Sequence, residues 1–197
     1  ERGFPDGPDN RIGFTVAPSD GSVLYATTVT PENEFLGVYR SLDGGDSWSE
    51  VSGFGVNGTG FEWYFGEMVI DPADPHRVFR NGFRLSELNG VTDDIWEEKF
   101  IDAHVDCHAL WIDPSNPQRM LLGHDGGLSI TEDGGTTETT FRNLPITQIY
   151  AMEVLESDPE VRFIGAQDNG TNAVNLFDTE WIRVLGGDGF RTTIDPF

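Results

Sequence analysis

Basic residues and cysteine are scarce in this chain, and each shortage removes a class of partner or of fold. Only 12 of the 197 residues are Lys or Arg, a single one of them lysine (Lys99), whereas 34 are Asp or Glu. The formal net charge of −22 argues against nucleic acid as a partner, because phosphate binding needs a basic face. The single cysteine, Cys107, excludes a disulfide framework.

Long apolar runs and helical patterns are also missing. No stretch is long and apolar enough to predict a membrane span, and the apolar residues recur with a period of 2 rather than 3.6. The 24 Gly and 11 Pro residues are typical of many short strands joined by tight turns. An acidic surface that is poor in lysine suits high salt or an extracellular setting, and we expect a secreted protein, extracellular or periplasmic.

The chain repeats itself every 42 residues. The segment Glu67–Pro75 is followed at that spacing by Ala109–Pro117 and then by Ala151–Pro159, and weaker copies lie at 12–18 and 192–196. A period of about 40 to 45 residues that contains strand-like runs is typical of a β-propeller blade. The repeat therefore predicts an all-β fold, a β-propeller built from four-stranded antiparallel blades.

We expect about four blades, within a single propeller segment that spans 1–197. The blades should cover residues 11–52, 66–101, 108–144 and 148–186, and a further blade should start at 190–197. Complete rings usually have about four to eight blades, and an open arc of blades leaves sheet faces uncovered. The chain is therefore expected to be part of a larger propeller and to associate with the rest of it.

Two predicted turns share a short motif. Residues 41–48, Ser-Leu-Asp-Gly-Gly-Asp-Ser-Trp, fit the Asp-box pattern Ser-x-Asp-x-Gly-x-Thr/Ser-Trp, and residues 131–137, Thr-Glu-Asp-Gly-Gly-Thr-Thr, repeat it with Glu138 in place of the Trp. A decayed third copy ends at Trp96. Both clear copies fall between the third and fourth strands of a blade. The chain thus resembles the Asp-box (BNR) repeat propellers, and among them the sortilin-like and BNR glycosyl-hydrolase-like groups.

The resemblance implies that the motif is structural rather than catalytic. Its Asp accepts backbone N–H bonds within the turn, its Gly adopts positive φ, and its Trp packs between sheets. Sialidases resemble this fold too, but they carry an arginine cluster and a Phe/Tyr-Arg-Ile-Pro motif that residues 141–145 do not match, so sialidase chemistry is not expected. The structural Asp-box residues are Ser41, Asp43, Gly45, Trp48, Thr131, Asp133 and Gly135.

The two ends of the blades collect different residues. In a four-stranded meander, the Asp boxes lie at one end, whereas the turns between strands 2 and 3 and the loops between blades lie at the other, which we call the loop face. The polar and aromatic residues of unusual sequence segregate to the loop face. The candidates there for ligand binding are His104, Asp106, His108, His124, Asp125, Gln167, Asp168, Asn169, Trp63 and Tyr64.

The segment from His104 to His108, His-Val-Asp-Cys-His, is the sharpest of these elements. If it is extended, His104, Asp106 and His108 point the same way and could bind a divalent cation, Zn²⁺ or Ca²⁺, with His124 or Asp125 as a further ligand. The same residues could act as acid and base, or could form a hydrogen-bonded network that closes the channel. Because this spacing is a loose pattern, the network is the favoured interpretation.

Two other segments have similar alternatives. Gln167-Asp168-Asn169 could hold a sugar or a cation, although Asp-Asn-Gly is well suited to a tight turn, and we favour the turn. Trp63 and Tyr64 lie in a Gly-rich insertion and could stack on sugar rings or fill the gap between blades.

Two functions remain open at this point. One is an extracellular binding or scaffold module that recognises a protein, a peptide or a carbohydrate on the loop face. The other is a glycoside hydrolase that acts on a neutral polysaccharide through two carboxylates about 5 to 10 Å apart. The catalytic candidates are Asp106, Asp125, Asp168 and Asp188. We favour binding, because no complete catalytic set can be assembled.

Overall fold

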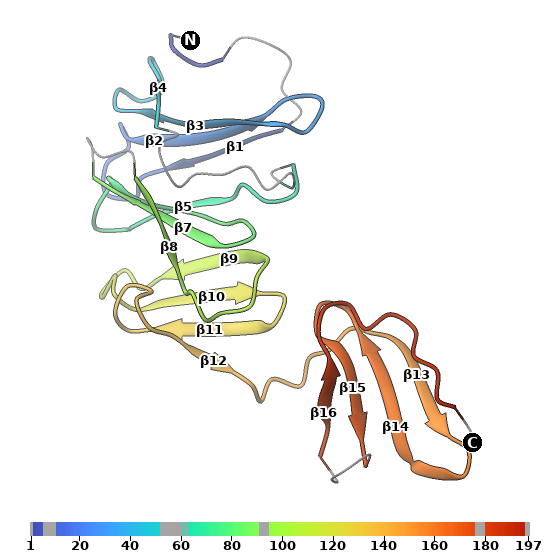
Figure 1. Ribbon diagram of the computed structural model, residues 1–197. Coiled ribbons are helices and arrows are strands. Elements are labelled where there is room, and N and C mark those ends of the chain that lie inside the picture. Colours follow the sequence, from blue (N-terminus) through green and yellow to red (C-terminus); the bar gives the residue numbers. More distant parts are fainter. Residues whose placement is uncertain are drawn as a thin grey trace. The chain divides into compact units, whose positions relative to one another are not determined.

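The predicted strand-rich architecture is confirmed by a computed structural model, which describes residues 2–5, 11–51, 61, 63–90, 95–175 and 180–195. These residues form sixteen strands in four antiparallel four-stranded sheets and contain no helix (Figure 1). Within the same ranges there is accordingly no helix that could span a membrane.

Each sheet is a meander whose strands pair in chain order. The first sheet contains β1 (Arg11–Val16), β2 (Leu24–Val29), β3 (Phe35–Ser41) and β4 (Ser49–Glu50). The second contains β5 (Met68–Ile70), β6 (Arg77–Arg80), β7 (Leu85–Asn89) and β8 (Trp96–Lys99). The third contains β9 (Cys107–Ile112), β10 (Met120–His124), β11 (Gly127–Thr131) and β12 (Thr139–Phe141). The fourth contains β13 (Ile149–Leu155), β14 (Asp158–Ala166), β15 (Gly170–Val174) and β16 (Ile182–Leu185).

The chain divides into two compact units, residues 1–141 and residues 142–197, and each is described by itself. The first unit holds the first three sheets and the second unit holds the fourth. The third sheet begins at Cys107, one residue before the expected start of its blade, and the membership of the four sheets in one ring stays a prediction. Residues 190–195, expected to begin a further blade, form no strand.

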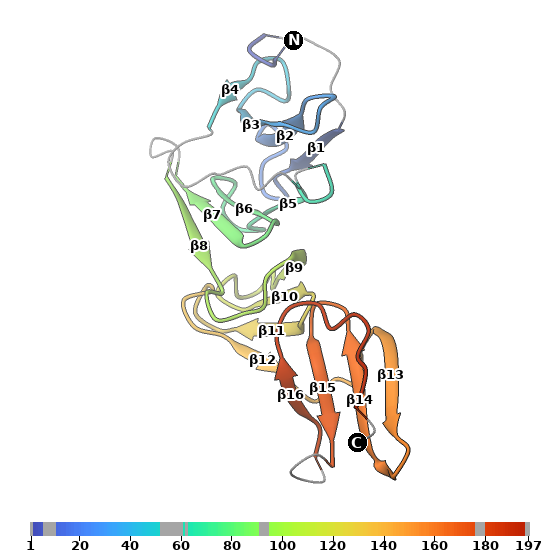
Figure 2. The same ribbon diagram turned by 45° about the vertical axis from the view of Figure 1, so that its right-hand side comes forward.

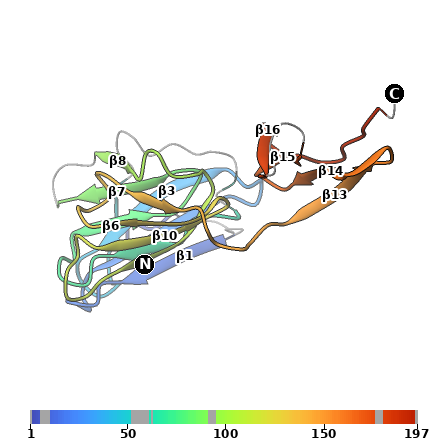
Figure 3. The ribbon, with the colours of Figure 1, turned by 90° about the horizontal axis from the view of Figure 1, so that it is seen from below.

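Apolar side chains from facing sheets hold the first unit together. Tyr25 and Val38 of the first sheet pack with Val78, Leu88 and Trp96 of the second, and all five are buried. A second buried cluster joins the second and third sheets and includes Phe79, Leu85, Met120 and Leu122. Removing each such side chain from water stabilises the fold by roughly 1.5–3 kcal/mol. The three sheets are therefore stacked in chain order (Figures 2 and 3).

The two Ser/Thr-Asp turns, after β3 and after β11, have the same hydrogen bonds. Asp43 Oδ1 accepts from the Ser47 backbone N–H at 2.8 Å, and Asp133 Oδ1 accepts from that of Thr137 at 2.9 Å. The hydroxyls of the same two residues donate to the other carboxylate oxygen. These hydrogen bonds hold the pKa of Asp43 below its usual value and lower that of Asp133 to about 2. Gly45 has φ of 96°, a conformation that glycine adopts without strain.

The aromatic residue of the motif does not pack between sheets as expected. Trp48 is half-buried, donates its indole N–H to the carbonyl of Gly45 at 3.1 Å, and contacts Phe4 edge-on at 5.4 Å. Its turn lies at the end of a sheet, so the ring covers the turn instead. Trp96 does pack between sheets, with its indole N–H donating to Val51 at 3.1 Å. Residues 91–94 of the decayed third motif lie outside the described residues.

Candidate functional site

Three segments meet at the loop face of the first unit. They are residues 63–65 before β5, residues 104–108 leading into β9, and residues 124–127 at the turn between β10 and β11. The meander explains this meeting, because the turns between second and third strands lie at the same end as the connections between sheets. Ring contacts and one hydrogen bond, described below, define the loop cluster: Trp63, Tyr64, Phe65, His108 and Asp125.

A histidine and a carboxylate form the polar centre of the loop cluster. His108 Nε2 lies 2.7 Å from Asp125 Oδ1, and both side chains are partly exposed. A carboxylate only accepts hydrogen bonds, so Nε2 carries the proton and donates the hydrogen bond to Asp125. Tyr64 meets the His108 ring edge-on at 5.7 Å between centroids, and Phe65 lies tilted against it at 5.4 Å. The pair therefore has a fixed orientation beside aromatic surface.

The aromatic segment of the cluster is tied down through its backbone, which leaves its rings open. Arg11 Nη1 donates to the carbonyls of Trp63, at 2.8 Å, and of Tyr64, at 2.6 Å. Trp63 is 43% exposed and Tyr64 is 56% exposed. Both residues are partly exposed, while Tyr64 also contacts Phe65 and His108, and stacking on a sugar ring stays a prediction.

The segment that contains His104, Asp106 and His108 is not extended, so the expectation that these side chains point together is wrong. Asp106 has φ of 63°, in the left-handed region, and β9 begins only at Cys107. His104 stacks on His124, with centroids 6.2 Å apart, whereas His108 pairs with Asp125. In the described part of the chain, no three His, Cys, Asp or Glu side chains are grouped to hold a metal ion. The hypothesised Zn²⁺ or Ca²⁺ site therefore has no ligand set in these residues.

His124 is a buried residue that holds a turn rather than a surface residue that meets a ligand. Its Nδ1 accepts the backbone N–H of Gly126 at 3.1 Å, and its Nε2 donates to Ser129 Oγ at 2.9 Å. Burial, and next the neighbouring His104, lower the pKa of His124. A neutral imidazole with its proton on Nε2 satisfies both bonds. His124 thereby fixes the turn that carries Asp125.

Cys107, which follows Asp106, points into the core. Its thiol is buried beside Phe79 and Leu85, and burial raises the pKa of the thiol to about 12. A thiol that stays protonated is a poor nucleophile, so thiolate chemistry is not expected at this site.

The remaining candidates belong to the second unit. Gln167, Asp168 and Asn169 form the turn between β14 and β15, in which Asp168 has φ of 57° and its N–H donates to Asp188 Oδ1 at 3.1 Å. The four catalytic candidates therefore divide into Asp106 and Asp125 in the first unit, and Asp168 and Asp188 in the second.

The sequence did not single out Phe65, Arg11 or Gly126. Phe65 follows two aromatic candidates directly, which was a usable signal. Arg11 lies more than fifty residues before its partners, and no local pattern could have joined them.

Comparison with known proteins supports the fold described above. No family model and no curated protein matches the chain. Among solved structures, a GH74 enzyme from Niastella koreensis is 17% identical with a TM-score of 0.54, over 86% of this chain and 29% of that chain. The extracellular domain of a putative hybrid two component system from B. thetaiotaomicron is 15% identical with a TM-score of 0.50, over 92% and 22%. The chain thus spans less than a third of the length of either structure.

At these identities the likeness establishes the fold alone. Together with the four meandering sheets and the repeat, it makes the chain an all-β protein with the fold of a partial β-propeller of about four blades.

Proposed function

We propose that the chain is an extracellular Asp-box propeller segment that acts as a binding module, and that its loop cluster binds a carbohydrate. The observation that carries this proposal is the exposed pair of Trp63 and Tyr64 beside the hydrogen-bonded pair of His108 and Asp125. Aromatic faces stack on the C–H surface of a sugar ring, while a carboxylate and an imidazole bond its hydroxyls. The acidic, lysine-poor composition and the extracellular neighbour support the secreted setting.

The assignment to Asp-box, sortilin-like propellers is part of this proposal. It is supported by the shared hydrogen bonds of Asp43 and Asp133, which recur at equivalent turns of two sheets. These carboxylates are engaged within their own turns, at the opposite end of the sheets from the loop cluster.

The binding proposal is tested by titrating the chain with neutral oligosaccharides in a calorimeter. Trp63→Ala should weaken binding roughly tenfold, because it removes one stacking face. Trp181→Ala is the matched control, since Trp181 is 50% exposed but lies in the second unit. Equal losses in both variants, or no binding by the parent chain, would refute the proposal.

A glycoside hydrolase is the second candidate, favoured by the GH74 neighbour and by the partly exposed carboxylate of Asp125. On this hypothesis, Asp125→Asn should abolish the release of reducing ends from a neutral polysaccharide. If the parent chain binds the polysaccharide but releases no reducing ends, the hydrolase hypothesis is refuted and only the binding module remains.

A further inference from the structure

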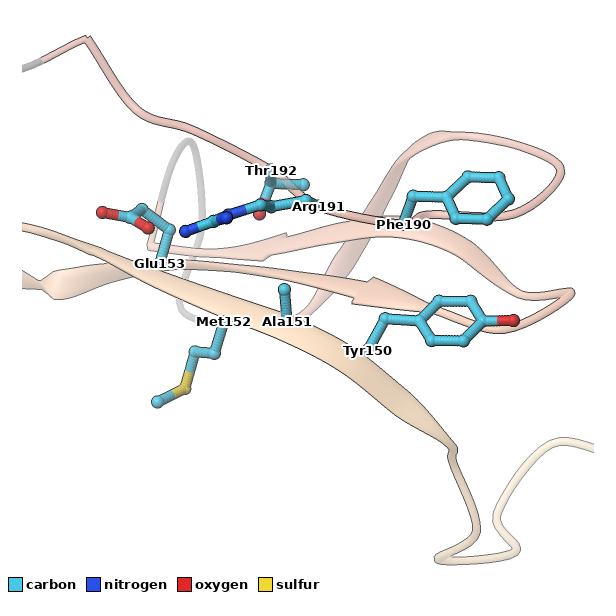
Figure 4. Close-up of a pocket in the computed structure, with 7 residues that line it drawn as sticks. All are labelled: Tyr150, Ala151, Met152, Glu153, Phe190, Arg191 and Thr192. Atoms are coloured by element: carbon cyan, nitrogen blue, oxygen red, sulfur yellow. The ribbon is translucent and has the colours of Figure 1, made fainter.

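A second aromatic cluster lies at the end of the fourth sheet where β14 turns into β15, which we call its loop end because it corresponds to the loop face. The rings of Tyr150, in β13, and Phe190, in the segment after β16, are almost parallel, with an interplanar angle of 5° and centroids 5.5 Å apart. Both rings point in the same direction (Figure 4). Tyr150 is 46% exposed and Phe190 is 62% exposed, so the stacked pair presents aromatic surface to solvent.

Backbone contacts within the second unit fix this pair. The N–H of Gly189 donates to the carbonyl of Ala166 at 2.8 Å, which ties the segment before Phe190 to the end of β14. A Cβ on Gly165 would lie 1.9 Å from the Phe190 carbonyl oxygen, so the segment crosses β14 where only a glycine fits. Phe190 therefore has a defined place opposite Tyr150.

Two carboxylates, those of Asp168 and Asp188, lie near the pair. Asp188 Oδ1 accepts the backbone N–H of Asp168, so these two residues lie together. Desolvation, and then the charges of Asp188 and Asp168, raise the pKa of Tyr150, so both carboxylates lie near this side chain. Arg191, which lines the same cavity as the two rings, extends away from them toward Glu153 (Figure 4). An open cavity of about 540 Å³ adjoins the pair and is large enough for a side chain of a partner.

We propose that Tyr150, Phe190, Asp168 and Asp188 form a binding site for a cationic group, the guanidinium or ammonium of a basic side chain on a peptide or protein partner. The faces of aromatic rings attract cations through their quadrupole, and two carboxylates add charge complementarity. A net charge of −22 on the whole chain favours approach of a basic partner. The site goes beyond the carbohydrate proposal and depends on none of its residues.

The site is tested with two capped amino acids of nearly the same shape. Acetyl-arginine methylamide carries the charge, and acetyl-citrulline methylamide is its neutral counterpart. Each is titrated into the whole chain while the ring signals of Tyr150 and Phe190 are followed by NMR. The arginine derivative should bind at least about fivefold more tightly than the citrulline derivative, and added salt should weaken the binding of the arginine derivative.

Variants separate the aromatic and ionic contributions. Phe190→Leu keeps apolar bulk and should weaken arginine binding about threefold, and Asp188→Asn should weaken it by a similar factor. Trp181→Leu, an exposed aromatic of the same unit, should have no effect. Equal affinity for arginine and citrulline, shifts confined to other residues, or full affinity in both site variants would overturn the proposal. Loss of oligosaccharide binding in Trp63→Ala tests the carbohydrate proposal and does not bear on the cation site.

Discussion

The loop ends of the third and fourth sheets carry equivalent residues of the repeat but are held in different ways. His108 and Tyr150 lie one repeat of 42 residues apart, and each is the second residue of the first strand of its sheet. Near His108, the side chain of His124 holds the turn. Near Tyr150, the backbone of the segment at Gly189 is bonded to the end of β14 instead. The repeat determines where a residue lies, and its neighbours determine its chemistry.

The difference follows from three substitutions between the two turns. His124, Asp125 and Gly126 are replaced one repeat later by Ala166, Gln167 and Asp168. In the third sheet, one carboxylate pairs with an imidazole, whereas in the fourth, two carboxylates lie beside an aromatic pair. We therefore expect a neutral polar ligand at the first turn and a cationic ligand at the second.

The largest effect is expected where backbone obstructs a new side chain. Gly165→Ala would place its Cβ 1.9 Å from the Phe190 carbonyl oxygen, so the segment at residues 189–190 must move. We expect a loss of up to about 3 kcal/mol in the free energy of unfolding and a loss of the stacked Tyr150 and Phe190 pair. Urea unfolding and the ring signals of Tyr150 check both. Unchanged ring signals would contradict the close crossing.

At the third sheet, the obstacle is a side chain. A Cβ on Gly126 would lie 2.6 Å from Cβ of His104, whose attachment to the backbone limits how far it can move. Gly126→Ala should cost about 2 kcal/mol in unfolding free energy. Gly21→Ala is the matched control for both glycine variants, because nothing lies within 4 Å of its added Cβ. A stability equal to that of the control would show that the turn does not depend on this packing.

Two substitutions separate the hydrogen bonds of the His124 side chain from the effect of its size. In His124→Asn, the amide oxygen takes the place of Nδ1 and accepts the Gly126 N–H, whereas the longer His124→Gln reaches the place of Nε2. The Asn variant should be more stable than the Gln variant by about 1 kcal/mol, the net value of one hydrogen bond. It should also keep the imidazole ¹⁵N signals of His108, which depend on Asp125 in the same turn. Identical His108 signals in both variants would show that the Gly126 bond does not position Asp125.

The sequence predicted the sheets and the end at which the polar residues gather, because a 42-residue repeat and a period of 2 act over many positions at once. Single side-chain directions were not predictable in the same way. One left-handed residue, Asp106, separates His104 from His108, and although Asn and Asp adopt positive φ more often than most residues, residue type does not say which of them will. Phe190 was missed because its stacking on Tyr150 depends on how a loop crosses β14, which is a tertiary contact.

The smallest effect concerns the opposite end of the third sheet, where charge rather than a neutral imidazole holds the turn. Hydrogen bonds from Thr137, and then Thr131, lower the pKa of Asp133 to about 2 from 3.8. A carboxyl whose pKa is depressed by folding stabilises the fold above its unfolded pKa, and this stabilisation is lost as the pH falls toward the folded value. The stability difference between the parent and Asp133→Asn should therefore be constant above about pH 5 and shrink between pH 4 and about pH 2. Chemical denaturation over this range measures it, with Glu132→Gln as a neighbouring charge removal that leaves the Asp133 hydrogen bonds intact. A difference that does not vary with pH would mean that the charge of Asp133 does not contribute to holding the turn.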